Sequence, residues 1–158
     1  MTVLLDNTVL SNFSSVRRPD LVRDALGDPV GTTEQAYQEL VDGVASGKVP
    51  ACDWRWLEII ALADSERAQY EALCEHLGSG EASCLAAAQR RAYRVATDDR
   101  DARRVARQLG IPITGTLGIL AILAKRGSVP LTEADGLLQQ MVAAGFRAPL
   151  TSLRTLLG

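Results

Sequence analysis

Short apolar runs alternate with longer helical segments along this chain, and the alternation constrains the fold more than any other feature. Five runs have the length and apolar character of buried strands, at residues 2–5, 30–32, 55–62, 93–97 and 111–114. For the run at 55–62 a strand is the prediction and a helix is the alternative, because so short a segment shows no decisive periodicity. Strands separated by helices pair in parallel, so the sequence predicts a three-layer α/β/α sandwich with a central parallel sheet.

Local start and stop signals mark the helices. Residues 7–15 are a helix start or a loop, and Pro19 opens a helix that ends near residue 26. Thr32 with Gln35 fits a capping box for a helix over 33–46. Residues 78–80 form a tight connection before a helix. The other predicted helices span residues 65–77, 81–91, 99–109, 115–126, 132–144 and 149–157.

Length and composition are those of a globular protein of one domain. We expect a single domain over residues 1–158, with a helical C-terminal part from about residue 115. The net charge of −2 argues against an overall electrostatic attraction to nucleic acid, although a local basic face is compatible with it. No apolar run is long enough to span a bilayer and no secretory signal is visible, so we expect a cytoplasmic protein without membrane partners.

Acidic residues occupy the positions where this fold would bring them together. Asp6 and the Asp98-Asp99 pair follow predicted strands, whereas Glu39 and Glu81 lie on predicted helices. The carboxyl ends of parallel strands face one edge of the sheet, where ligands of such folds bind. Carboxylates gathered there repel one another, and a divalent cation such as Mg²⁺ or Mn²⁺ relieves the repulsion. The acids therefore indicate metal-assisted chemistry on phosphate esters.

The same acids fall within four motifs that resemble those of the PIN-domain nucleases, in the same order. The first is LLDNTVL at residues 4–10, and the second is the Thr-Thr pair followed by Glu-Leu within 32–40. The third is GEASCLAAA at 80–88, and the fourth is ATDDRDAR at 96–103. The similarity continues through residues 110–118 into the helical tail and covers essentially the whole chain.

This resemblance implies a doubly wound α/β/α fold, an acidic pocket for Mg²⁺ or Mn²⁺, and endonuclease action on RNA. It assigns metal binding and catalysis to Asp6, Glu39, Glu81 and Asp99, with Asp98 as a substitute or supporting group. Many small members are VapC-like toxins, held inactive by a cognate antitoxin and often homodimeric. Glu81 stands where many members carry Asp, and the tail resembles a less characterised prokaryotic branch. A PIN-fold module that binds RNA or a partner protein without cleavage is the alternative.

Each acid also has a simpler explanation. Asp6 and Asp98 could cap the helices that follow them, and Glu39 could be a solvated helix residue. Glu81 near a helix start is favourable from the helix dipole alone. Four acids in family order favour the shared site over four separate explanations.

A basic face lies on the helix predicted at 99–109, next to the acidic pair. Its arginines could hold a nucleic-acid backbone near the metal, and an ordinary solvated face is an equal alternative. Trp54 and Trp56 could stack on unpaired bases, although burial or a dimer contact is the better expectation. The arginines of the basic face are Arg100, Arg103, Arg104 and Arg107.

The residue patterns needed for a disulfide-stabilised fold, a Ser-His-Asp triad or a phosphatase with an Asp nucleophile are absent from the sequence. The three cysteines, Cys52, Cys74 and Cys84, are widely spaced, so we expect buried free thiols rather than disulfides. His76 is the single histidine and there is no GxSxG motif, which argues against a Ser-His-Asp triad. Thr8 stands where haloacid-type phosphatases carry a second Asp, which argues against a phosphatase that uses Asp6 as nucleophile.

Overall fold

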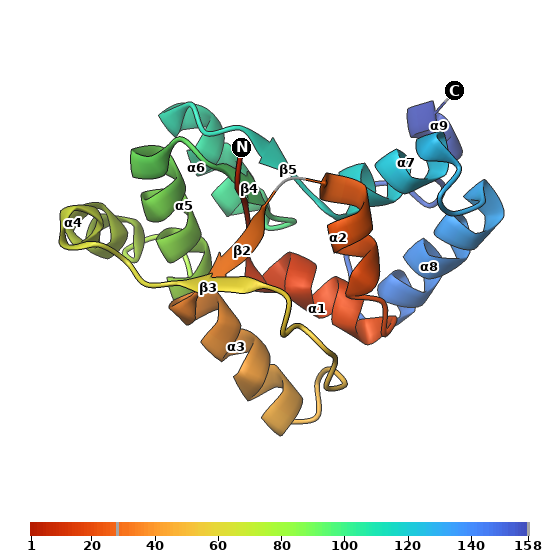
Figure 1. Ribbon diagram of the computed structural model, residues 1–158, viewed down its shortest axis with the longest axis horizontal. Coiled ribbons are helices and arrows are strands. Elements are labelled where there is room, and N and C mark those ends of the chain that lie inside the picture. The colour runs from red at the N-terminus through yellow and green to blue at the C-terminus, as the bar shows by residue number, and fades with distance from the viewer. Residues whose placement is uncertain (28, 158) are drawn as a thin grey trace.

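The computed structural model describes residues 1–27 and 29–157, and a five-stranded parallel sheet lies at its centre (Figure 1). The strand order is β3-β2-β1-β4-β5, so the order along the chain reverses between β1 and β4. All strand pairs are parallel, as predicted. The strands are β1 Val3–Leu5, β2 Val30–Thr33, β3 Glu58–Ile60, β4 Arg94–Ala96 and β5 Ile113–Thr114.

Helices cover both faces of the sheet (Figure 1). Helices α5 and α6 contribute to one core, and α1, α2, α7 and α8 contribute to the other. The three-layer α/β/α sandwich predicted from the sequence is therefore confirmed. The helices of the described residues are α1 Asn7–Ser15, α2 Asp20–Leu26, α3 Glu34–Ala45, α4 Asp64–Leu73, α5 Ser79–Arg91, α6 Arg100–Leu109, α7 Thr116–Arg126, α8 Leu131–Ala143 and α9 Arg154–Leu157.

Alternation along the central strands separates the two cores. Val3 and Leu5 of β1 belong to the core with α1 and α7, whereas Leu4 belongs to the core with α5 and α6. In the neighbouring β4, Ala96 belongs to the core with α1 and α7, and Val95 belongs to the core with α5 and α6. Successive strand side chains point to opposite faces, so a strand of three apolar residues is buried on both sides.

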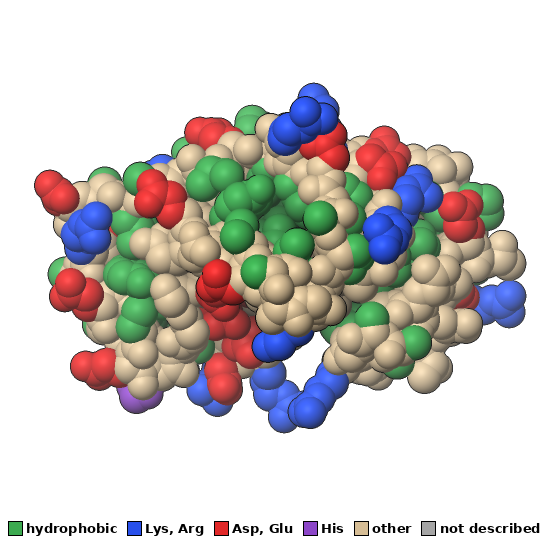
Figure 2. All heavy atoms as spheres, turned by 90° about the horizontal axis from the view of Figure 1, so that it is seen from below, with side chains coloured by type: hydrophobic (Ala, Val, Ile, Leu, Met, Phe, Trp, Pro, Cys, Tyr) green, Lys and Arg blue, Asp and Glu red, His purple; other side chains and the backbone are tan. Residues whose placement is uncertain are grey.

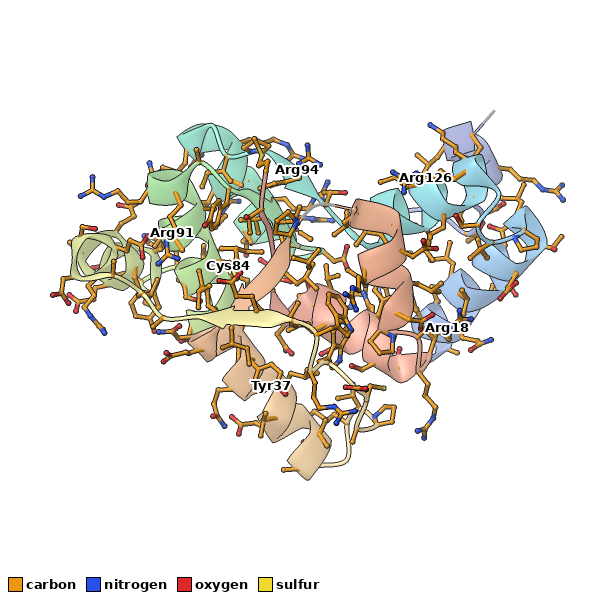
Figure 3. All side chains as sticks on the ribbon, in the orientation of Figure 1. Arg18, Tyr37, Cys84, Arg91, Arg94 and Arg126 are labelled. Atoms are coloured by element: carbon orange, nitrogen blue, oxygen red, sulfur yellow. The ribbon has the colours of Figure 1, made fainter. Side chains whose placement is uncertain are left out.

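The C-terminal helices extend one core. Ile119, Leu120 and Leu123 of α7 are fully buried in the same cluster as residues of α1 and α2. Arg126, at the end of α7, donates from Nη1 to the carbonyl oxygen of Ala25 at 3.0 Å (Figure 3). The helical tail is thus fastened to the first helices of the chain.

The predicted single domain includes Asp28 and Gly158, which lie outside the described residues, and its extent stays a prediction. Within the described ranges, no helix combines the length and the apolar character needed to cross a membrane.

The predicted capping box of α3 is wrong by one residue. Thr33 is the N-cap, and its hydroxyl oxygen accepts a hydrogen bond from the N–H of Ala36 at 3.1 Å. Thr32 instead donates from its hydroxyl to the carbonyl oxygen of Leu5 at 2.6 Å. The reason is that β2 continues through Thr33, which keeps Thr32 inside the sheet.

Other boundaries also differ from the prediction. The helix predicted at 65–77 ends at Leu73, because residues 74–76 form a turn. The strand expected at 55–62 shrinks to the three residues of β3, because Leu57 donates to the carbonyl oxygen of Trp54 in a turn. Residues 78–80 are the N-cap and first residues of α5 rather than a connection. The last helix begins at Arg154, later than the sequence predicts.

Candidate functional site

The predicted acidic residues lie around the carboxyl edge of the sheet, where the strand order reverses. Asp6 directly follows β1, and Asp98 and Asp99 follow the neighbouring β4. Glu39 lies on α3, and Glu81 lies in the first turn of α5. Figure 2, seen from below, shows a row of acidic side chains near the middle of this face. Open parallel sheets bind their ligands at such a switch point.

Asp6 is fully buried, and only one of its carboxylate oxygens is bonded. Oδ1 accepts hydrogen bonds from the N–H groups of Thr8 at 3.0 Å and Val9 at 3.3 Å and from the Thr8 hydroxyl, so Asp6 does cap α1. Oδ2 is buried without a partner among the described residues. Burial raises the pKa of Asp6 to about 7, the hydroxyls of Thr8 and nearby Thr97 act to lower it, and Asp98 and Glu81 add repulsion. The Thr97 hydroxyl does not reach Oδ2 with hydrogen-bond geometry. A buried oxygen left unbonded is rare in native proteins and needs an explanation beyond capping.

Glu39 lies against α5 close to Gly80, whose lack of a side chain leaves room for the Glu39 carboxylate. A Cβ atom on Gly80 would overlap Glu39 Oε1 and would stand 3.2 Å from the Cα of Ala36. Glu39 Oε1 is also buried and unbonded within the described residues. Burial raises the pKa of Glu39 against a lowering contribution from the nearby N–H of Gly80, and Asp42 adds repulsion. Glu39 is therefore not a solvated helix residue.

Glu81 lies between the other acids. Burial raises the pKa of Glu81, and repulsion from Asp99 and Glu39 adds to the effect. Its Oε2 lies so near Gly78 that a Cβ there would stand only 2.7 Å away. The N-terminus of α5 favours a negative charge at this place, but the raised pKa shows that burial and the neighbouring acids outweigh that help.

The two members of the Asp98-Asp99 pair have different partners. Asp98 accepts hydrogen bonds from the N–H of Thr116 at 2.8 Å, from the Thr116 hydroxyl, and from Asn12 Nδ2 at 2.9 Å. Asp99 is the N-cap of α6, accepting from the N–H of Ala102 at 2.8 Å through Oδ2 alone. Asp98 thus joins α1 and α7 to the end of β4, while Asp99 keeps one oxygen for another partner.

Repulsion links the five acids into one group. Asp6 is destabilised as an anion by Asp98 and Glu81, and Glu81 by Asp99 and Glu39. In the described ranges, however, no three carboxylate, thiol or imidazole groups are gathered closely enough to hold a metal ion. The acids share one electrostatic field without forming a closed set of ligands.

Arg103, predicted to contact nucleic acid, is used inside the protein. Its Nη1 donates to the carbonyl oxygens of Thr97 at 2.8 Å and Thr114 at 3.1 Å. These carbonyls stand at the ends of β4 and β5, so Arg103 holds the two strand ends together. Burial raises the pKa of Asp98 overall, while the hydrogen bonds from Thr116 and Asn12 and the charge of Arg103 lower it.

Of the other three arginines of the basic face, one forms an ion pair and two do not. Arg104 pairs with Asp101 at 3.3 Å on the exposed side of α6. Arg100 and Arg107 are exposed and have no hydrogen bond or ion pair within the described part of the chain. Both line a groove of about 1260 Å³ that also reaches Asp98 and Asp99. Figure 2 shows Lys and Arg side chains around a notch beside the acidic row.

Neither tryptophan lies in the sheet, because both precede β3. Trp54 is buried and donates from Nε1 to Ser14 Oγ at 2.9 Å, so it is a core residue. Trp56 is partly buried, with the Arg23 guanidinium 5.7 Å from its ring centroid.

Of the three cysteines expected to be buried, only Cys84 is; Cys52 is partly buried and Cys74 is exposed. Cys84 points from α5 toward the sheet (Figure 3), and burial raises the pKa of its thiol. A protonated, enclosed thiol is not a nucleophile. His76 is exposed in the turn after α4.

Sequence reasoning missed the polar residues that connect the acids. The Thr8 hydroxyl bonds to Asp6 and accepts from the N–H of Asp98 at 2.8 Å. Gly115 lets Asp98 approach, since a Cβ there would stand 2.7 Å from Asp98 Oδ1. The available signal was position: Thr8 lies two residues after the first acid, and Thr116 directly follows that glycine.

Comparison with known families decides the relationship. A family model described as a PIN domain matches residues 2–158. The chain belongs to the PIN-domain family. The resemblance seen in the sequence is thereby confirmed, and PIN domains are commonly nucleases that act on RNA and use divalent metals. A comparison with curated proteins returned no match.

Proposed function

We propose that this PIN-domain protein is a divalent-metal-dependent endoribonuclease that hydrolyses RNA phosphodiesters. The observation that carries the proposal is the unbonded Oδ2 of Asp6, buried at the switch point of the sheet among other acids. Burying a carboxylate oxygen without a donor or a positive charge destabilises the fold. A bound cation supplies that charge, so the unbonded oxygen of Asp6 is explained by a metal-binding role.

The residues present fit Mg²⁺ or Mn²⁺, because every candidate ligand is a carboxylate oxygen. Asp6, Glu39, Glu81 and Asp99 would hold the ion, and Asp98 would support them from its place between α1 and α7. When bound, the ion lowers the pKa of a water molecule and stabilises the negative charge that develops on the phosphate.

The chain's own side chains then handle the proton and the substrate. Glu81 is only partly buried, so a water molecule can reach its carboxylate. We assign to it the proton of the attacking water. Asp98 and Arg103 fix the ends of β4, β5 and α7. These contacts hold the acidic pair in place beside the groove.

The test is cleavage of varied RNA substrates by purified protein with Mg²⁺ or Mn²⁺, compared with EDTA. Asp6→Asn should lower the rate about a thousandfold. The control Asp64→Asn removes a fully exposed carboxylate on α4 and should cleave normally.

A second readout does not depend on activity. Mn²⁺ should raise the melting temperature of the wild type and of Asp64→Asn, but not that of Asp6→Asn. Equal shifts in all three proteins, or no shift in any, would refute the proposed ion site.

A PIN-fold module that binds RNA or a partner without cleaving it is the second candidate. It is favoured by the open arrangement of the acids and by Asp98, whose oxygens are already bonded. RNA binding that persists with EDTA and is never followed by cleavage would identify this function.

We extend the first proposal to a toxin of a toxin–antitoxin pair that forms a homodimer. The toxin role is suggested by the family resemblance. The homodimer is suggested by the exposed apolar surface of Val41 on α3 and Ile59 on the edge strand β3, which are 42% and 45% exposed. Light scattering should give a dimer mass that falls in Ile59→Ser. Expression should arrest growth in the wild type but not in Asp6→Asn, and co-expression of the antitoxin should relieve the arrest.

A further inference from the structure

Two buried hydroxyl groups join the end of β2 to α5. Thr33 is the last residue of β2 and the N-cap of α3, and Ser83 lies in the second turn of α5. Both residues are fully buried, and their hydroxyl oxygens are 2.6 Å apart. Neither is a ligand or a base in the proposed reaction, although α3 carries Glu39 and α5 carries Glu81.

The direction of this hydrogen bond follows from the other contacts of the two hydroxyls. The Ser83 hydroxyl donates to the carbonyl oxygen of Gly80 at 2.7 Å, so towards Thr33 it can only accept. Thr33 therefore donates to Ser83, while its own oxygen accepts from the N–H of Ala36 at 3.1 Å. A continuous series of hydrogen bonds thus runs from the first turn of α3 to the first turn of α5.

The same elements are also bonded to the end of β1. The thiol of Cys84 on α5 donates to the carbonyl oxygen of Leu5 at 3.6 Å. The Thr32 hydroxyl on β2 donates to the same carbonyl at 2.6 Å. Because Leu5 directly precedes Asp6, these polar contacts connect the strand end that carries the first acid with the starts of both acid-bearing helices.

The hydroxyl pair lies where α5 approaches α3 most tightly. A Cβ atom on Gly80 would stand 3.0 Å from Glu39 Cδ and 3.2 Å from the Cα of Ala36. Ser83 bonds to the carbonyl of that same glycine. Glu39 is also close enough to Glu81 to repel its negative charge. A small shift of α5 against α3 would therefore change the spacing of the two carboxylates.

We propose that Ser83 and Thr33 are positioning residues, whose hydrogen bond fixes the spacing of the Glu39 and Glu81 carboxylates for one divalent cation. The inference rests on the proposed function for its ion and extends it to residues that contact neither ion nor RNA. A hydrogen bond constrains both distance and direction, whereas apolar side chains in the same space would let the helices slide. Groups behind metal ligands orient them, and their loss weakens metal binding about 10- to 100-fold.

The experiment measures Mn²⁺ affinity by isothermal titration calorimetry and the melting temperature in EDTA. Ser83→Ala should weaken Mn²⁺ binding about tenfold. The matched control is Ser14→Ala, which removes a similarly buried hydroxyl that accepts from Trp54 Nε1 at 2.9 Å. Each variant should lower the melting temperature by about 3 °C, because each loses a buried hydrogen bond. Ser14→Ala should nevertheless bind Mn²⁺ like the wild type.

Two substitutions of Thr33 separate hydrogen bonding from packing, and they test the inference even where Ser83→Ala does not fold. Thr33→Ser keeps the hydroxyl and loses only a methyl group, so its Mn²⁺ affinity should equal that of the wild type. Thr33→Val keeps the shape and loses the hydroxyl, so it should weaken Mn²⁺ binding about tenfold.

Two outcomes would overturn the inference: Ser83→Ala binding Mn²⁺ as tightly as Ser14→Ala, or Thr33→Ser weakening binding as much as Thr33→Val. Failure of the proposed function looks different. Mn²⁺ binding that depends on Ser83 and on Asp6, without any cleavage of RNA, would reject the nuclease and keep the positioning role. A wild type that binds no Mn²⁺ would reject the ion site and the inference together.

Discussion

Two buried carboxylates, Glu66 on α4 and Asp6 at the acidic edge, differ in their bonding partners and in the direction of their pKa shifts. Glu66 is 2% exposed, and its oxygens accept from Arg91 Nε at 2.8 Å, from Arg91 Nη2 at 2.9 Å and from the N–H of Ala63 at 2.7 Å. The Arg91 hydrogen bonds lower the pKa of Glu66. Asp6 has an unbonded oxygen, and burial raises its pKa to about 7.

The contrast shows what each carboxylate does. Arg91 extends from the end of α5 toward α4 (Figure 3), and there it supplies a bidentate partner and also donates to the carbonyl oxygen of Ala61. Glu66 therefore holds helices together. No described cation fills the same role for Asp6, so its negative charge remains available to a ligand that arrives from solution.

The largest expected effect is on the pH dependence of apo stability. The pKa of Asp6 is raised in the folded state, so its stabilising contribution is present at low pH and is lost as pH rises toward and through about 7. From about pH 5 to pH 8, Asp6 should remove about 3 kcal/mol.

Asp6→Asn should lack this loss, and at pH 8 in EDTA it should be more stable than the wild type. Urea denaturation at several pH values measures both. A wild-type profile parallel to that of Asp6→Asn would mean that Asp6 has a partner in solution. Glu66, whose pKa is lowered, acts in the opposite direction: its contribution is present at neutral pH and is lost as pH falls below its ordinary value.

Next in size is Arg91→Gln. This change leaves Glu66 buried without its counter-charge and should lower the free energy of unfolding by about 2 kcal/mol, since Arg91 itself is partly exposed. Arg90→Gln, an exposed neighbour on the same helix, is the control and should cost little. Cleavage per folded molecule should be unchanged in both, which separates the stabilising carboxylate from the functional ones.

Asp98→Asn tests a carboxylate that shares features of both Glu66 and Asp6. Its oxygens are bonded like those of Glu66, but it lies beside Asp6. The amide would turn a donor toward the donors of Thr116 or Asn12, so we expect a loss of about 1.5 kcal/mol. Thermal and urea unfolding measure it. A more stable variant would show that repulsion with Asp6 outweighs those hydrogen bonds.

The smallest effects come from two glycine substitutions. Gly80→Ala should change stability by no more than about 1 kcal/mol, because better helix propensity offsets the overlap with Glu39. It should nevertheless reduce cleavage strongly by displacing that carboxylate. Gly136→Ala on α8 meets no atom within 4 Å and should stabilise by up to about 1 kcal/mol with normal activity. Normal cleavage by Gly80→Ala would remove Glu39 from the site.

Much of the fold followed from local patterns. Apolar runs such as Val3–Leu5 predicted buried strands, and their alternation with helices predicted the parallel sheet. Boundaries were less accurate where a tertiary contact outweighed a local signal. Thr32 had the spacing of a cap but bonds to Leu5 within the sheet, and the residues before β3 form a turn that places Trp54 in the core.

The candidate site was predictable only as a set of acids. Asp6 and Asp98 could be named from their positions after strands, but nothing local shows that one is unbonded and the other bonded by Thr116 and Asn12. Asn12 lies 86 residues before Asp98, and Thr116 lies 18 residues after it. Hydrogen bonds across such separations depend on packing, which residue spacing alone does not express.

The sequence by itself determined the layers, the family and the order of the acids, because strand length, helical periodicity and motif spacing are local properties. Only the tertiary structure decided which arginines are committed to the protein and which acid lacks a partner. Those outcomes depend on distances between elements, and in a doubly wound sheet neighbouring strand ends come from segments far apart in the chain.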